Sequence, residues 1–470
     1  MYTPLLLSKS RLFTNEKYTI LVVFTLCIAL RAAPELMAYP YPIGYDVINY
    51  YIPTVTNFED KWDTVSKQFP LYVTFLYLLS IITGLPAYSV VVAVIIIMTG
   101  IFGISLFYLG RNLLKLGISH SAFIAIFAIV QLAVLRTTWD FHRDIFALTI
   151  MMFVFSLLSR KNAGWKPLVL VLGLTTLAVA ADRMVGALFS VSVAAYAIMT
   201  RRRDVALTGI LAIGMFYALA VPTQSTPDIK TITTAEIPQN NSELKEFYNP
   251  ADLLIFFVVI NGLLIAAAAI GFLNMKNTLL KIPLVVCLIG SFSWLVFPEN
   301  RYLLADRWII LAGIFLSVFA GYGILHLIRN LKKRFTIAGF ILAAFAVLGV
   351  TYAVIPHDSA SALYGIIGLH SKNLPPVTMQ FNSLDVEDND ELLSTIAWIN
   401  KNTEQDALIV GESHLRGFME LHLEDNRTYH FSEDPQTFAE TLINRGQQVY
   451  LIEFNSTSSP IFVVKDISNR

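Results

Sequence analysis

The feature that most constrains this chain is a succession of apolar runs, most of them long enough to form a helix that crosses a bilayer. Such a helix needs about 20 apolar residues. Twelve candidate runs occur, at 18–38, 70–84, 88–110, 118–136, 144–159, 167–181, 184–200, 205–222, 251–273, 280–297, 306–328 and 335–355. Hydrophobic residues make up 55% of the 470 residues and charged residues only 14%, against about 25% charged residues in soluble domains. So few charges cannot cover a set of globular surfaces, and we predict an α-helical polytopic membrane protein.

The distribution of positive charge predicts how the chain is threaded. The run 70–84 is short and is bounded by Pro70 and by the Gly84-Leu85-Pro86 break. If it lies in the membrane surface and the N-terminus is cytoplasmic, the inner connections hold 17 Lys and Arg residues and the outer ones nine. A spanning 70–84 would move Arg201–Arg203 and Lys332–Arg334 outside, against the positive-inside rule. We therefore predict eleven spans, an interfacial helix in a first outer loop at 39–87, and a multi-pass protein of the cell membrane with an extracytoplasmic C-terminus.

Several functional classes are excluded by what the chain lacks. Its 34 basic and 34 acidic residues cancel, so there is no overall basic field for nucleic acid. Cys27 and Cys287 both lie inside apolar runs, which excludes a disulfide framework. No P-loop, GxGxxG or HExxH motif is present. The first run is too long for a signal-peptide core and is expected to be retained as a span.

After about residue 357 the composition becomes that of a soluble segment. Residues 392–399, 415–423 and 435–444 follow helical patterns, and 407–410 and 449–454 are short apolar strands. This alternation predicts a small extracytoplasmic α/β domain, with Pro375-Pro376 and the acidic run 385–391 as its linker. We divide the chain into a membrane module, 1–356, and a linker plus domain, 357–470. Three N-x-[ST] sequons, at Asn240, Asn426 and Asn455, all fall on the predicted outer side.

Ionisable residues gather at the predicted outer ends of the spans. Four outer connections carry them, in the stretches Gly44-Tyr45-Asp46, Trp139-Asp140-Phe141-His142-Arg143-Asp144, Asp182-Arg183, and Glu299–Arg301 with Asp306-Arg307. Carboxylates at one membrane depth suit a divalent metal or a general base, and arginines suit phosphate. Each residue alone has a simpler interpretation. Asp140 would be the N-cap of a helix starting at Phe141. Arg183 and Arg307 would extend to lipid headgroups, and their ion-pair partners would be Asp182 and Asp306. The four groups together, on one side, favour function.

These residues resemble those of the C-type (GT-C) glycosyltransferases, in particular archaeal members and the dolichyl-phosphate-mannose mannosyltransferase and aminoarabinose transferase superfamily. The similar features are the Gly44-Tyr45-Asp46 motif with its trailing tyrosines after the first span, the Gly110-Arg111 span end, the stretch 301–313, and the tail 391–410. The layout is similar over nearly the whole chain. The resemblance therefore implies a GT-C fold.

The resemblance also implies an activity, that of a hexosyltransferase using a polyprenyl-phosphate (dolichyl-phosphate-type) sugar donor at the outer face. It assigns Asp46 as the catalytic base or as a residue that orients the acceptor, and it assigns binding of the lipid phosphate to Arg183, Arg301 and Arg307. In some members the first-loop aspartate holds Mg²⁺ or Mn²⁺ together with acids that would correspond to Asp140 or Asp144. The residues expected to line the substrate site are Tyr45, Tyr50, Tyr51, Trp139, His142 and Arg143.

The acceptor stays open between a glycan, a lipid and a protein. The tail lacks the Trp-Trp-Asp-Tyr-Gly motif of oligosaccharyltransferase catalytic subunits, and Asp46 is followed by Val47 instead of the second acid of protein mannosyltransferases. Two other classes are alternatives. A secondary transporter would show internal repeats and broken helices at mid-membrane, and a non-catalytic scaffold presenting the outer domain would need no clustered acids and arginines.

Overall fold

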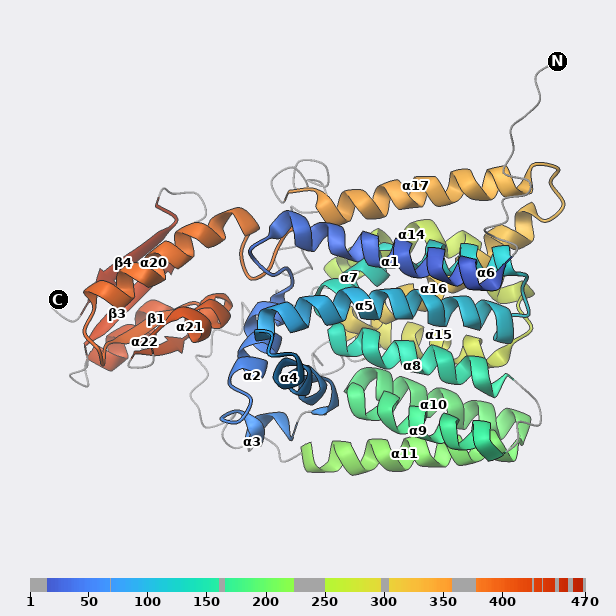
Figure 1. The fold of residues 1–470 in the computed structure, drawn as a ribbon, viewed down its shortest axis with the longest axis horizontal. Coiled ribbons are helices and arrows are strands. Elements are labelled where there is room, and N and C mark those ends of the chain that lie inside the picture. Colours follow the sequence, from blue (N-terminus) through green and yellow to red (C-terminus); the bar gives the residue numbers. More distant parts are fainter. Residues whose placement is uncertain are drawn as a thin grey trace, which may run out of the picture.

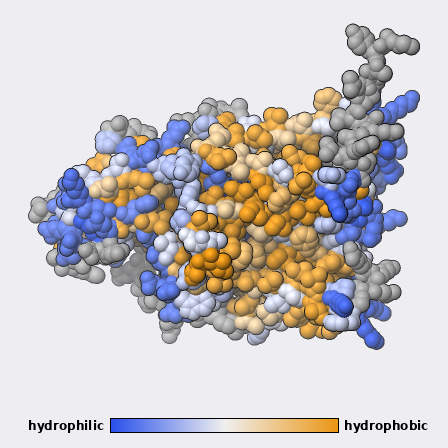
Figure 2. Space-filling model, in the orientation of Figure 1, coloured by the Kyte–Doolittle hydropathy of each residue, from blue (hydrophilic) through white to orange (hydrophobic). Residues whose placement is uncertain are grey.

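The computed structural model describes residues 15–67, 69–159, 165–223, 250–296, 304–356, 378–424, 427–432, 434–443, 448–454 and 460–467. Within these ranges the chain is mostly helical. Long helices lie side by side in a bundle, and a small domain containing a β-sheet sits at one end of that bundle (Figure 1). A broad hydrophobic surface covers the bundle, while hydrophilic residues gather over the small domain and at the opposite end (Figure 2). A chain with this pattern is a multi-pass membrane protein.

Each of the eleven predicted spans contains at least one helix. The bundle helices are α1 (Glu16–Ala38), α5 (Ala87–Tyr108), α6 (Ile118–Ile129), α7 (Leu132–Asp140), α8 (His142–Leu158), α9 (Trp165–Ala181), α10 (Arg183–Thr200), α11 (Arg203–Thr223), α14 (Pro250–Asn274), α15 (Thr278–Ser291), α16 (Ala305–Ile328) and α17 (Arg334–Val354). Of the described helices, seven are long and apolar enough to cross a membrane, or eight if α6 and α7 count as one span, while α9 and α15 are apolar but shorter. The predicted total of eleven spans is therefore not confirmed.

The predicted straight span at 118–136 is broken. Helix α6 ends at Ile129 and α7 begins at Leu132, with an angle of 61° between them. The side chain of Gln131, at the break, donates to the Phe127 carbonyl at 2.7 Å. The break changes the direction of the chain. Helix α7, in which residues 133–140 are all buried, therefore runs toward the end of the bundle that bears the small domain (Figure 1).

The segment between α1 and α5, which we predict to be the first outer loop, folds into short helices. They are η3 (Val47–Tyr51), α2 (Ile52–Thr56), α3 (Trp62–Val65) and α4 (Leu71–Thr83). Gly84 ends α4 in the left-handed conformation, with φ of +67°, which glycine adopts without a steric penalty. Figure 1 shows α4 nearly end-on while the long helices run across the picture, an orientation that suits a helix lying in the membrane surface.

The C-terminal part forms an α/β domain, as the alternating pattern predicts. Its elements are η7 (Val386–Asp388), α20 (Asn389–Asn402), β1 (Leu408–Gly411), η8 (Ser413–Leu415), α21 (Arg416–His422), β2 (Thr428–Phe431), α22 (Pro435–Ile443), β3 (Val449–Phe454) and β4 (Phe462–Asp466). The strand order is β2-β1-β3-β4, with β1 parallel to β2 and β3, and β4 antiparallel to β3. The acidic run 385–391 forms η7 and the first turn of α20, while Pro375-Pro376 and the asparagines of the three sequons lie outside the described residues.

Candidate functional site

The Gly44-Tyr45-Asp46 motif packs directly against the end of α7. Gly44 has φ of +103°, and a Cβ atom there would lie 2.2 Å from the Trp139 carbonyl oxygen. Only glycine fits this combination of backbone angle and close approach. As a result the backbone N–H of Asp46 donates to Oδ1 of Asp140 at 2.5 Å. The two acids, 94 residues apart in sequence, are neighbours because Gly44 lets the loop reach α7.

Arg136 neutralises part of this acidic pair. Its Nη1 lies 3.3 Å from Oδ2 of Asp140, one helical turn along α7. The guanidinium carbon also lies over the rings of Trp139 and Phe141, at 4.2 and 4.9 Å from their centres. Asp140 is the last residue of α7, whereas α8 begins at His142 with no side-chain cap. The alternative role of Asp140 as an N-cap is therefore wrong.

Two further arginines, Arg143 and Arg307, and two further acids, Asp144 and Asp182, lie near the pair formed by Asp46 and Asp140. Arg307, in the first turn of α16, lies 4.7 Å from the centre of the Phe141 ring and interacts electrostatically with Asp46, Asp144 and Asp182. The carboxyl groups of Asp144 and Asp182 are in hydrogen-bonding contact. We use the name acid–arginine cluster for Asp46, Asp140, Asp144, Asp182, Arg136, Arg143 and Arg307.

The environment of Asp46 changes its acidity. Burial, and then the neighbouring Asp140 carboxylate, raise the pKa of Asp46 from 3.8 to about 7, while Arg307, Arg143 and Arg136 oppose this shift. A carboxyl group with a pKa near neutrality is suited to accept a proton from a substrate hydroxyl. Asp46 lies outside the bundle helices, just before η3, and is only partly buried.

Asp182, rather than Arg183, faces the cluster. Asp182 is 4% exposed, and its Oδ1 accepts the backbone N–H of Val185, which makes it the N-cap of α10. Arg183 is the exposed first residue of that helix. A phosphate-binding role for Arg183 stays a prediction, and Arg301 lies outside the described residues.

The predicted substrate-lining residues divide by burial. Tyr45 is 38% exposed, and Tyr50 and Arg143 are partly buried, with the Arg143 guanidinium carbon 5.3 Å from the centre of the Tyr50 ring. Tyr51, Trp139 and His142 are each 1% exposed. Tyr51 stacks on His142, with ring centres 5.0 Å apart. Because these three residues are buried, they pack behind the more exposed Tyr45, and a substrate-lining role for them stays a prediction.

Sequence reasoning missed an ion pair inside α1. Nη2 of Arg31 lies 2.6 Å from Oε1 of Glu35, and both side chains are almost fully buried. Nε of Arg31 also donates to the carbonyl of Thr138 at 3.1 Å, two residues before Asp140. The signal was available, because an Arg and a Glu four residues apart in an apolar run are neighbours on one helix face.

The side chains that the structure describes do not assemble a metal site. Within the described ranges, no group of three His, Cys, Asp or Glu residues is placed to hold a metal ion. Asp140 already receives the Asp46 N–H and Arg136, and Asp144 is engaged with Asp182. The predicted Mg²⁺ or Mn²⁺ site at Asp46, Asp140 and Asp144 does not fit this arrangement.

The C-terminal domain contacts the loop that carries Asp46 through a hydrogen bond, an ion pair and apolar packing. The backbone N–H of Gly417 donates to Oδ1 of Asn49 at 2.8 Å, and Lys61 pairs with Glu420 at 2.6 Å. Ile48, next to the site, belongs to the hydrophobic core of the domain. The indole Nε1 of Trp139 donates to the carbonyls of Met379 and Phe381, at 3.0 and 2.9 Å. The acid–arginine cluster thus lies where the bundle, the loop between α1 and α5, and the C-terminal domain meet.

No family model matches the chain, and no curated protein matches it by sequence. Among solved structures, the apo oligosaccharyltransferase of Archaeoglobus fulgidus aligns with a TM-score of 0.57 at 10% identity, covering 93% of this chain and 69% of that one. The A. fulgidus oligosaccharyltransferase AglB in complex with an inhibitory peptide and a dolichol-phosphate aligns with a TM-score of 0.50 at 11% identity, with the same coverage. The mycobacterial arabinofuranosyltransferase AftD aligns at 0.49 and 13% identity, covering 94% of this chain and 35% of that one. The chain thus shares the GT-C fold of the archaeal enzyme, as the resemblance predicts.

Proposed function

We propose that this protein is an integral-membrane glycosyltransferase that moves a hexose from a polyprenyl-phosphate donor to a glycan, lipid or protein acceptor. The observation that carries the proposal is the acid–arginine cluster, which brings four acids and three arginines together from four separate parts of the chain. A GT-C neighbour whose structure holds a dolichol-phosphate supports the class of donor. Buried ionisable groups at the edge of a membrane bundle are functional candidates.

In this proposal Arg307 binds the donor phosphate, assisted by Arg143 and by Arg301, which precedes Arg307 by six residues in the sequence. The lipid tail stays in the bilayer and the phosphate lies at its surface, at the depth of the first turn of α16. When the bond between the sugar and the phosphate breaks, negative charge develops on the phosphate. Fixed guanidinium groups stabilise that charge more in the transition state than in the ground state.

Asp46 is the proposed base. The acceptor hydroxyl attacks the anomeric carbon, its proton passes to the Asp46 carboxylate, and the polyprenyl phosphate leaves on the opposite face of the sugar. This sequence inverts the anomeric centre. The partly exposed rings of Tyr45 and Tyr50 lie beside Asp46 and offer flat apolar faces for a sugar ring.

The proposed orientation places this end of the bundle outside the cell, with the N-terminus inside. The charge bias of the connections supports it. A protease added to intact cells is expected to remove the domain that starts after residue 357, and the N-terminal segment should be cut only after lysis. Full protection of the domain in intact cells would reverse the orientation.

A transfer assay tests the proposal directly. Purified full-length protein would be mixed with radiolabelled polyprenyl-phosphate hexoses and with membranes of a native host strain that lacks the protein, which supply acceptors. We expect label to move from the lipid to an acceptor, and polyprenyl phosphate alone to raise the thermal unfolding midpoint of the protein. If neither transfer nor stabilisation occurs, the transporter and scaffold alternatives replace this proposal.

A further inference from the structure

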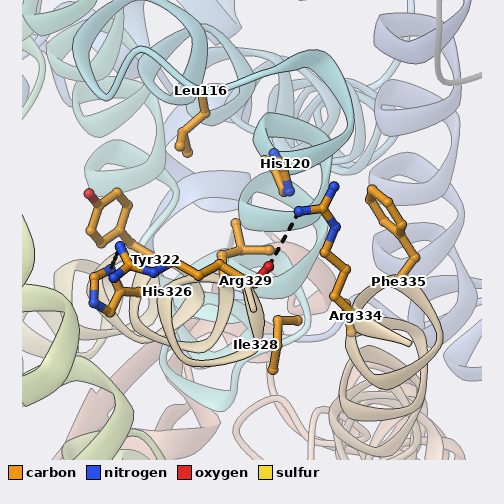
Figure 3. Close-up of a pocket in the computed structure, with 10 residues that line it drawn as sticks. Leu116, His120, Tyr322, His326, Ile328, Arg329, Arg334 and Phe335 are labelled. Atoms are coloured by element: carbon orange, nitrogen blue, oxygen red, sulfur yellow. Dashed lines mark hydrogen bonds between the residues drawn. The ribbon is translucent and has the colours of Figure 1, made fainter. Parts of the chain in front are cut away.

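A second polar site lies at the end of the bundle opposite to the C-terminal domain. It is a pocket of about 240 Å³ between the start of α6, the last turns of α16 and the first turn of α17 (Figure 3). The turn that joins α16 to α17 carries Arg329, Lys332, Lys333 and Arg334. Nothing in the proposed sugar transfer uses these residues.

The pocket combines cationic groups with an apolar wall. Its polar residues are Arg329, Arg334, His120, His326 and Tyr322, and its described lining includes no Asp or Glu. The apolar wall consists of Leu116, Leu325, Ile328, Phe335 and Ala338. A cavity with this lining favours a ligand that carries negative charge at one end and apolar surface at the other.

Arg329 and Arg334 both lie at the rim of the pocket, and their side chains point to different sides of it. Nη1 of Arg334 donates to the carbonyl of Arg329 at 3.4 Å, and Nη1 of Arg329 lies 3.4 Å from Nδ1 of His326. Figure 3 shows Arg334 reaching toward His120 while Arg329 extends toward His326. The Arg334 guanidinium carbon also lies 5.1 Å from the centre of the Phe335 ring. Because guanidinium groups bind phosphate oxygens through paired N–H donors, this rim has the chemistry of a phosphate site.

The position favours a lipid over a soluble phosphate. The long apolar helix α16 ends at the pocket, and the long apolar helix α17 begins there. The mouth of the pocket therefore lies where a bilayer surface would meet the protein. Phe335 is 57% exposed and Leu331, in the same turn, 47% exposed, which leaves apolar surface beside the cationic rim. Basic pockets between membrane helices at this depth are suited to lipid headgroups.

We propose that this pocket binds the phosphate of an anionic phospholipid from the leaflet opposite to the acid–arginine cluster. Arg334, beside His120, holds the phosphate. Arg329, His326 and Tyr322 contact the rest of the polar headgroup on the other side of the pocket, and the glycerol end lies along Phe335. The volume accommodates a headgroup and leaves the acyl chains in the bilayer.

The test compares two double variants of the full-length protein with the same net charge. Arg329→Gln/Arg334→Gln removes both cations of the rim, whereas Lys332→Gln/Lys333→Gln removes two exposed cations of the same turn that do not line the pocket. Thermal unfolding in detergent would be followed during titration with dihexanoyl phosphatidylglycerol, dihexanoyl phosphatidylcholine or inorganic phosphate. We expect saturable stabilisation by phosphatidylglycerol, weakened about tenfold or more in the arginine variant and unchanged in the lysine variant.

Three outcomes overturn the proposal. Equal weakening in both double variants would mean that only the charge of the turn matters. Equal stabilisation by phosphatidylcholine would remove the preference for anionic lipid, and equal stabilisation by inorganic phosphate would make the ligand soluble. Arg329→Lys/Arg334→Lys keeps the charge and controls for folding, and we expect it to retain lipid binding with intermediate affinity, because lysine lacks the forked donors.

Discussion

The two ends of the helical bundle use arginine in opposite ways. At the end under the C-terminal domain, Arg136, Arg143 and Arg307 interact with four acids, of which Asp140, Asp144 and Asp182 are buried and Asp46 is partly buried. At the other end, Arg329 and Arg334 are exposed and line a pocket whose described residues include no acid. In the proposed function the first arrangement holds charges in place for sugar transfer, and in the proposed lipid site the second leaves positive charge available to a ligand. Substitutions at the first end should therefore change turnover, and those at the second should change only the response to lipid.

The sharpest way to break this comparison is Asp46→Asn. The substitution keeps the size of the side chain but removes the base, so we expect turnover to fall by about a hundredfold or more while donor binding and thermal stability stay near wild type. The measurement is initial transfer rate at saturating donor. Asp63→Asn, in the same loop but exposed, serves as the control and should transfer normally. A near-normal rate in Asp46→Asn would remove Asp46 from the mechanism.

Arg307→Gln should have the next largest effect. Loss of one charge-assisted contact to phosphate costs about 1.5–3 kcal/mol, which corresponds to roughly ten- to a hundredfold weaker use of the lipid-linked donor. The donor dependence of transfer would be compared with that of Lys333→Gln, which removes a cation at the other end of the bundle. Unchanged donor dependence in Arg307→Gln would mean that Arg307 only contacts lipid headgroups.

The pH profile should show a smaller effect. Because the pKa of Asp46 is raised to about 7, the carboxylate that acts as base is mostly protonated at pH 6 and mostly ionised at pH 8. We expect kcat/KM to rise about tenfold across this interval, with an inflection near pH 7 that is absent from the residual activity of Asp46→Asn. A flat profile over the same range would contradict the assigned base.

The smallest change in activity is expected from Gly417→Ala, which tests how the domain supports the loop. A Cβ at Gly417 would lie 2.1 Å from the Ile48 carbonyl oxygen, so the domain must shift, at a cost of roughly 1–3 kcal/mol. We expect a lower thermal midpoint and a loss of only a few-fold in turnover. Gly339→Ala, where nothing lies within 4 Å of the new atom, should have no such effect. Equal midpoints in the two variants would show that the close approach is unimportant.

The sequence predicted the central strands of the C-terminal sheet better than its edge strands. Strands β1 and β3 are central in the sheet and apolar, and both were expected from the pattern. Strands β2 and β4 are the two edges, and the side chains of β2 are all at least partly exposed. An edge strand that is open to solvent has no clear apolar run, so its pattern resembles that of a loop.

The candidate site was likewise predictable only in part. Because outer loops meet at one membrane depth, the convergence of Asp46, Asp140 and Arg307 could be expected from their positions. The choice between Asp182 and Arg183 depends on which residue caps α10, which composition does not specify. The bend of 61° between α6 and α7 and the bond from Arg31 to Thr138, across 107 residues, depend on tertiary packing that no local pattern records.

The hydrogen bonds of Trp139 have a consequence for how the protein is made. The carbonyls that accept its indole N–H lie 240 and 242 residues further along the chain. At a synthesis rate of about 5–20 residues per second, those acceptors emerge from the ribosome roughly 10–50 s after the tryptophan. During that interval the indole of Trp139 lacks both of these hydrogen-bond acceptors. A nascent chain is therefore expected to gain activity only when its tail has been synthesised and has joined the bundle, however early its membrane helices insert.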